Sequence, residues 1–213
     1  MKTVLKTVLM ILMLVAGSAA AQSKYEAAIL KGKDLLKSAD DQEAYMGCAN
    51  YFERIAQKES KEWLPLYYHS LSLTLWGTRE TNPDTKEKVL NDALALVQKA
   101  KKIEKNSELA ALEGFVQMMR LTVDPATRGQ TLSPTIYALF GEAIALDPEN
   151  PRAVLLMGQM EFGTAQFFGS GFEKACGYIQ RAYDIFERTP DELTTLPTWG
   201  KGMAEASLAH CNQ

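Results

Sequence analysis

A repeated helix-start pattern is the feature that most constrains how this 213-residue chain can fold. Asn106 and Asn150 each precede a stretch of helical apolar spacing, and each is followed eight positions later by a glycine, Gly114 or Gly158. The two starts lie 44 residues apart. An asparagine in this position caps the free N–H groups of the first helical turn. Self-similarity at a period of this length predicts a stack of similar helical units.

The helices expected between these starts carry a second pattern, in which small and large apolar residues are spaced four and then three positions apart. It occurs three times: Ala93, Val97 and Ala100; Ile136, Phe140 and Ala143; Ala175, Ile179 and Ala182. A small residue lets two helices approach closely, and a large residue fills the groove beside it. Each helix pair then leaves an apolar face that only the next pair can cover, which predicts a solenoid with a concave surface.

Helical periodicity extends over nearly the whole chain, and strand-like alternation is scarce. We therefore expect an all-α fold of about nine helices. Residues 124–129 are interpreted as a structured turn, and Ser133-Pro134 as the start of the next helix, because proline suits a first helical turn. The expected helices are 24–38, 41–57, 62–77, one through 89–100, 107–121, one from 133, one from 150, 172–187 and 199–211.

Part of this pattern resembles the tetratricopeptide repeat family. The residues that carry the resemblance are Phe140, Ala143 and Pro148, then Asn150-Pro151 and Gly158. The resemblance implies an α-solenoid of antiparallel helix pairs, a TPR-like superhelix whose concave face binds peptides or protein segments. The period of 39 to 44 residues departs from the family's period of about 34. The chain also resembles small exported bacterial proteins of this family, which implies no particular activity.

The first 21 residues are predicted to be a secretory signal peptide. Lys2 and Lys6 precede an apolar run over residues 8–15, and small residues fill positions 17–21. These features are typical of a signal peptide, and the run is too short to span a membrane. We expect cleavage after Ala21, which leaves residues 22–213 as a single domain outside the cytoplasm, in the periplasm or the medium. No cysteine lies near the cut, so we expect neither a lipid anchor nor membrane insertion.

Charge and cysteine content narrow the class of protein further. The net charge is -3, so the chain lacks the excess of basic residues that nucleic-acid binding needs. The three cysteines are Cys48, Cys176 and Cys211, and an odd number leaves at least one unpaired within the chain. Residue type favours small buried thiols. If the exported chain forms one disulfide, the candidate pair is Cys176 and Cys211.

The sequence contains no pattern of an enzyme, a metal site or a cofactor site. His69 and His210 are the two histidines, and neither belongs to a nucleophile motif or a set of metal ligands. No Gly-x-Ser-x-Gly elbow and no phosphate loop is present. We therefore expect a protein without catalytic activity, cofactor or metal.

The favoured function is a scaffold of the bacterial cell envelope that binds a protein or peptide on its concave face. Aromatic side chains are useful at such interfaces. The candidate contact residues are Trp63, Tyr67, Tyr68, Phe115, Met118, Gln159 and Phe162. The alternative is a periplasmic protein that binds a small ligand or a glycan, which exposed tryptophans would favour and buried ones would weaken. The sequence leaves open the partner, the oligomeric state, and whether a terminal helix of the chain fills the groove.

Overall fold

The computed structural model describes residues 22–189 and 193–211, and the expected signal peptide lies outside these ranges. Within them the chain forms nine helices and no strand, which confirms the all-α, solenoid-like fold class. The N-terminal helix covers residues 22–38. The others are α2 (Gln42–Lys58), α3 (Leu64–Arg79), α4 (Pro83–Ile103), α5 (Ser107–Leu121), α6 (Pro125–Leu146), α7 (Pro151–Phe168), α8 (Glu173–Arg188) and α9 (Lys201–Cys211).

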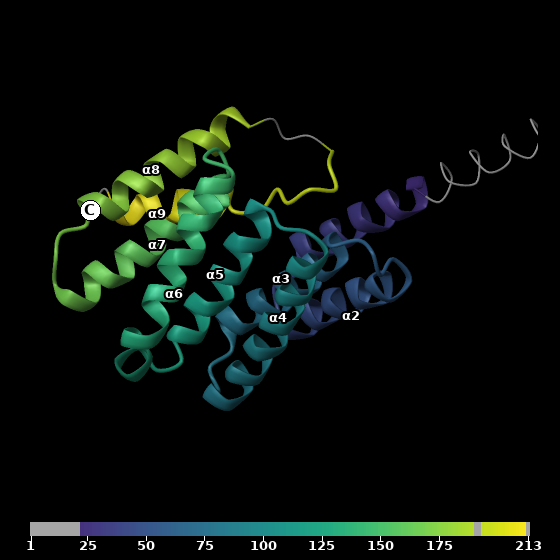
Figure 1. Ribbon diagram of the computed structural model, residues 1–213, viewed down its shortest axis with the longest axis horizontal. Helices are drawn as coiled ribbons and strands as arrows, with labels where there is room; N and C mark the ends of the chain where they lie inside the picture. Colours follow the sequence, from purple (N-terminus) through teal and green to yellow (C-terminus); the bar gives the residue numbers. More distant parts are fainter. Residues whose placement is uncertain (1–21, 190–192, 212–213) are drawn as a thin grey trace, which may run out of the picture.

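Successive helices run antiparallel and pack side by side along the molecule (Figure 1). Helix α5 also contacts both α3 and α7, so these three helices form an inner layer. Helices α4, α6 and α8 pack against this layer from outside. No helix among the described residues is long and apolar enough to cross a bilayer.

Short polar side chains start most of these helices. Asp or Asn caps the first turn of α2, α4, α5, α6 and α7 by accepting a hydrogen bond from a backbone N–H. Proline occupies the first turn of four helices, where its missing N–H removes no helical hydrogen bond. The repeated Asn106 and Asn150 are two of these caps, as the sequence predicted.

Glycines on the inner helices allow close packing against the outer ones. A Cβ atom on Gly158 would lie 2.8 Å from Ile179 of α8, and Gly114 stands in the same relation to Phe140 of α6. The small-against-large pairing expected from the sequence is therefore present in both hairpins. Gly77 repeats the pairing on α3, where a Cβ atom would lie 2.7 Å from a side-chain carbon of Leu90.

The expected boundary of the sixth helix is wrong. Helix α6 begins at Pro125, directly after the Asp124 cap, and it continues through Pro134. The predicted turn over residues 124–129 is thus the first part of this helix. Its early turns are held by Arg128, whose guanidinium pairs with Glu87 of α4 at 2.5 Å and donates to the carbonyl of Arg120 at 2.9 Å. These contacts offset the hydrogen bond that an interior proline removes.

Candidate functional site

The concave face of the inner helices is filled by the chain itself. Residues 193–200, here called the strap, precede α9 and form neither helix nor strand. In Figure 1 this segment returns from the side of the N-terminal helix and passes the inner helices before α9 begins. The sequence left open whether the groove is self-filled, and the C-terminal part of the chain is what fills it.

The first half of the strap is held through its backbone carbonyls. Tyr68 on α3 donates its hydroxyl proton to the carbonyl oxygen of Thr195, at 2.7 Å. Lys33 on the N-terminal helix donates to the carbonyl oxygen of Leu196 at 2.7 Å and to that of Thr194. Pro197, the next residue, is buried. The acceptors in the strap are all backbone carbonyls. These contacts therefore fix the path of the backbone and do not depend on which side chains the strap carries.

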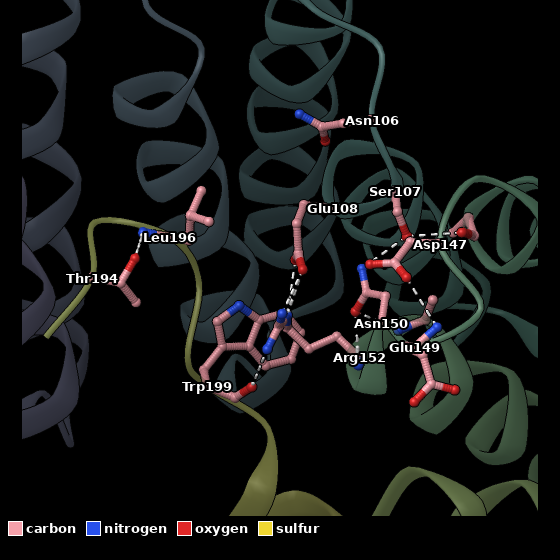
Figure 2. Close-up of polar contacts among 12 residues, drawn as sticks. Asn106, Ser107, Glu108, Asp147, Glu149, Asn150, Arg152, Thr194, Leu196 and Trp199 are labelled. Carbon is pink, nitrogen blue, oxygen red and sulfur yellow. Dashed lines mark hydrogen bonds and ion pairs between the residues drawn. The ribbon is translucent and has the colours of Figure 1, made fainter. Parts of the chain in front are cut away.

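Trp199 is the anchor of the strap. Its indole stacks on Phe115 of α5, with ring centroids 5.8 Å apart. Its Nε1–H donates to the hydroxyl of Tyr67 at 2.8 Å. The carbonyl oxygen of Trp199 accepts a hydrogen bond from Arg152 of α7 at 3.4 Å (Figure 2). One residue of the strap thereby contacts all three inner helices.

A buried ion pair lies beneath Trp199. Arg152 Nε approaches the two carboxylate oxygens of Glu108 to 3.0 Å and 2.8 Å, and the side chains are only 10% and 16% exposed (Figure 2). Burial by itself lowers the pKa of Arg152, but the carboxylate of Glu108 outweighs it and the net shift is upward. Burial also raises the pKa of Tyr67 well above its usual value. The groove therefore contains a neutralised pair and protonated tyrosines, with no free charge for a peptide terminus.

The seven predicted contact residues do not form one open surface. Tyr67, Tyr68 and Phe115 are buried beneath the strap, and Met118 is buried in the core. Trp63 is partly buried against Tyr67, with its ring edge toward it. The remaining two, Gln159 and Phe162, lie together on the part of α7 that faces α9.

Helices α7, α8 and α9 border a hollow at these two residues. A hollow of about 90 Å³ is lined by Gln159, Phe162, Ile179, Ser207 and His210. Phe162 stacks on Phe172, with centroids 4.4 Å apart, and lies 6.5 Å from the imidazole of His210.

The end of α7 and the residue before α8 expose three more aromatic rings. Phe167, Phe168 and Phe172 are 63%, 76% and 38% exposed. We call the set Phe162, Phe167, Phe168, Phe172 and His210 the aromatic patch. Single exposed apolar side chains are normal on protein surfaces, but an exposed apolar cluster marks an interaction or ligand site.

A disulfide links α8 to α9. Cys176 near the start of α8 is bonded to Cys211 at the end of α9, with Cα atoms 5.6 Å apart. The candidate pair is thus present, and the preferred interpretation of three buried thiols holds for Cys48 alone. Burial raises the pKa of the Cys48 thiol, which keeps it protonated and unreactive.

A second, larger hollow lies at the other end of the molecule. It encloses about 360 Å³ between the N-terminal helix and α2, and Leu35, Tyr51 and Arg54 contribute to its wall. The hydroxyl of Tyr51 already donates to the carbonyl of Ala28, at 3.1 Å.

Among the described residues, no group of three or more His, Cys, Asp or Glu side chains is placed to hold a metal ion.

Several of these residues were not predicted from the sequence. Phe167 and Phe168 precede Gly169-Ser170-Gly171, a segment interpreted only as a loop. Two adjacent phenylalanines in front of such a loop cannot both face a helix core, and that is the signal that could have identified them. Trp199 and the Glu108–Arg152 pair had no local signal, because their partners are distant in the sequence.

Comparisons with known proteins find a likeness in structure but none in sequence. No family model matches the chain, and no curated protein sequence matches it. Among solved structures, the chain is similar to the HusA haemophore from Porphyromonas gingivalis, with a TM-score of 0.79 and 26% sequence identity. The likeness covers 88% of this chain and 92% of that one. A helical-repeat-like fold is therefore supported, without a match to the tetratricopeptide repeat family.

Proposed function

We propose that this protein is an exported, non-enzymatic carrier of a flat tetrapyrrole of the haem type. The observation that carries the proposal is the likeness to the HusA haemophore, which extends over nearly the whole of both chains. A haemophore is by its name a carrier of haem. The N-terminal segment expected to direct export is consistent with such a role. This function is a specific form of the small-ligand alternative and differs from the favoured peptide scaffold.

The aromatic patch offers a surface of the right chemistry for such a ring. A tetrapyrrole is broad, flat and largely apolar, and aromatic side chains stack on flat rings in offset or edge-on arrangements. Phe162 and Phe172 already present a stacked pair, and Phe167 and Phe168 are exposed at the end of α7. A ligand that covered these rings would remove apolar surface from water, which favours binding.

A cation stands beside the patch for the carboxylates of the ligand. Lys174 follows Phe172 by two residues on the first turn of α8, and its side chain is 69% exposed. Its ammonium pairs with Glu161 at 2.6 Å. The carboxylate of Glu161 is only 15% exposed, so a ligand carboxylate would share this ammonium with Glu161 and not displace it.

Binding of a peptide in the groove is the less favoured function. It requires the strap to leave Tyr68, Phe115 and Arg152, whereas binding at the patch requires no rearrangement. A glycan is also less favoured, because none of the three tryptophans is exposed in the structure.

A haem titration tests the proposal. The purified protein is titrated with ferric haem while the Soret absorbance is followed, and we expect a saturable 1:1 complex. Phe167→Ser/Phe168→Ser should weaken binding by at least roughly tenfold, since burying one phenylalanine stabilises by about 1.5 to 3 kcal/mol. Both side chains are exposed, so this variant should remain folded.

Leu146→Ser is the matched control, because Leu146 is 51% exposed but lies at the end of α6, outside the patch. It should leave haem affinity unchanged. Absence of saturable binding to the unaltered protein would refute the proposed function. Saturable binding that both variants preserve would locate the ligand elsewhere, with the 360 Å³ hollow beside α2 as the next site to test.

A further inference from the structure

We propose that the hollow between the N-terminal helix and α2 binds a single-chain amphiphile with a carboxylate head. The site is separate from the aromatic patch, and the proposal does not rest on the proposed carrier function. The helices that border the two sites lie at opposite ends of the row of helices (Figure 1).

The size of the hollow is the first argument. It holds about 360 Å³, within the range of about 300 to 1,000 Å³ that small-molecule sites occupy. Its lining comes from the end of the N-terminal helix and from α2, namely Leu35, Ser38, Ala39, Ala44, Gly47, Cys48, Tyr51 and Arg54. Ala44 and Arg54 are ten residues apart, which is roughly 15 Å along an α-helix. An extended alkyl chain advances by roughly 1.3 Å per carbon, so a chain of about ten carbons fits this length.

The middle of the hollow suits an alkyl chain. A Cβ atom on Gly47 would meet no other part of the chain within 4 Å, so the floor of the hollow is open. Leu35 borders the hollow and is 41% exposed. An alkyl chain laid beside Leu35 would remove apolar surface from water, which favours binding. Tyr51 and Ser38 already donate their hydroxyl protons to backbone carbonyls of the N-terminal helix, which disfavours a sugar or another polyol.

Arg54 supplies the charge for the head group. It is the charged side chain of the lining, and no carboxylate contributes to the wall. Its guanidinium lies 6.0 Å from the ring centroid of Tyr51, and it forms no ion pair among the residues that the structure describes. An unpaired guanidinium can bind a carboxylate through two parallel hydrogen bonds. The lining therefore favours an anionic amphiphile over a cationic or an uncharged one.

Calorimetric titration of the purified protein with sodium decanoate tests the proposal, and decanol is the uncharged probe of the same chain length. We expect saturable 1:1 binding of decanoate and at least roughly tenfold weaker binding of decanol, because decanol cannot form a charged pair. Gly47→Leu, which fills the hollow, should abolish binding of decanoate. Gly141→Leu is the matched control, since Gly141 is also an exposed helical glycine with open space, but lies on α6. It should leave the affinity unchanged.

Arg54→Gln tests the charge. It should weaken binding of decanoate by at least roughly tenfold and leave the affinity for decanol unchanged. Arg79→Gln is the matched control, because the guanidinium of Arg79 also lies over a tyrosine ring, that of Tyr45 at 4.9 Å, but outside the hollow. It should change the affinity for neither probe. Both arginines are exposed, so both variants should remain folded.

Cys48 reports where the probe binds. It lines the hollow, and it is the free thiol of the chain because Cys176 and Cys211 are bonded to each other. Bound decanoate should slow the alkylation of Cys48 by iodoacetamide, followed by mass spectrometry under native conditions. The same slowing should occur in Gly141→Leu and not in Gly47→Leu.

The outcomes separate this proposal from the carrier function. Absence of saturable decanoate binding to the unaltered protein would overturn it. Equal affinity for decanoate and decanol would overturn it as well, because Arg54 would then contribute nothing. Binding that Gly47→Leu preserves, or that leaves the alkylation of Cys48 unchanged, would remove the ligand from this hollow. Each of these results leaves the carrier function standing, since the haem titration decides that function.

Discussion

Breaking the buried Glu108–Arg152 pair should destabilise this protein strongly. Arg152→Met removes the guanidinium that approaches both oxygens of Glu108, and it leaves a carboxylate that is only 16% exposed. The remaining hydrogen-bond donor is the hydroxyl of Tyr67, at 3.3 Å. Leaving one charge of a buried pair without its partner costs about 3 to 5 kcal/mol. With a urea dependence of about 2 kcal/mol per molar, the midpoint should fall by roughly 1.5 to 2.5 M.

Urea unfolding followed by circular dichroism at pH 7 measures this loss. The double variant Glu108→Met/Arg152→Met removes both charges and should lose less stability than Arg152→Met alone, because no buried charge is left unpaired. Arg188→Met is the matched control: its pair with Glu149 also joins two separate elements, but the side chains are 57% and 62% exposed. That variant should lose no more than about 1 kcal/mol.

Hydrogen exchange adds a readout in the strap. Arg152 donates to the carbonyl of Trp199, so amides of residues 193–199 should exchange faster in Arg152→Met than in Arg188→Met. The reasoning is refuted if Arg152→Met is no more costly than Arg188→Met. The single variant Glu108→Met completes the comparison. The reasoning is equally refuted if the double variant loses the sum of the losses of Glu108→Met and Arg152→Met, because the two charges would then be independent.

Three further changes test other parts of the fold. Gly158→Ala should lower the free energy of unfolding by about 1 to 3 kcal/mol because its Cβ meets α8, whereas Gly163→Ala, on the same helix with open space, should raise it by about 0.5 to 1 kcal/mol; equal melting shifts would contradict close packing. Cys176→Ser/Cys211→Ser removes a covalent link between residues 35 positions apart and should lower the free energy of unfolding, measured in urea, by about 4 kcal/mol. Equal stability of the reduced and the oxidised parent protein would contradict this prediction. Burial lowers the pKa of His69 in the folded state, so the unfolded chain gains a proton first and stability should fall as the pH drops through about 6.5. His69→Gln should reduce this dependence of stability on pH between about pH 7.5 and 5. An unchanged dependence would show that His69 does not cause it.

The sequence predicted the features that depend on local spacing. The caps at Asn106 and Asn150 and the pairing of Gly158 with Ile179 follow from residues that lie within one hairpin. Pro134 misled the prediction of α6, because Ser133-Pro134 has the composition of a helix start and the contacts of Arg128 with Glu87 are not local. Local spacing alone did not distinguish a new helix that starts at Ser133-Pro134 from one helix that continues through Pro134.

The strap could not be predicted in the same way. A segment outside the helices has no helical periodicity, and the hydrogen-bond partner of Trp199, Tyr67, lies 132 residues away in the sequence. The expectation that Tyr67, Tyr68 and Phe115 line an accessible face follows correctly from the inner-layer position of their helices. What it lacked was the segment that covers that face, which belongs to the opposite end of the chain.

The proposed location of the ligand site rests on side chains that the fold does not need for its stability. Phe167 and Phe168 remain 63% and 76% exposed, so they contribute little burial to the folded state, and water disfavours their presence at the surface. By contrast, Trp199 covers the aromatic side chains of the groove, Tyr67 and Phe115. Truncating either one would leave a cavity and destabilise the fold, whatever its effect on binding. Substitutions in the groove therefore confound binding with stability. Substitutions in the patch separate the two, and that separation makes the patch the place where the haem proposal can be decided.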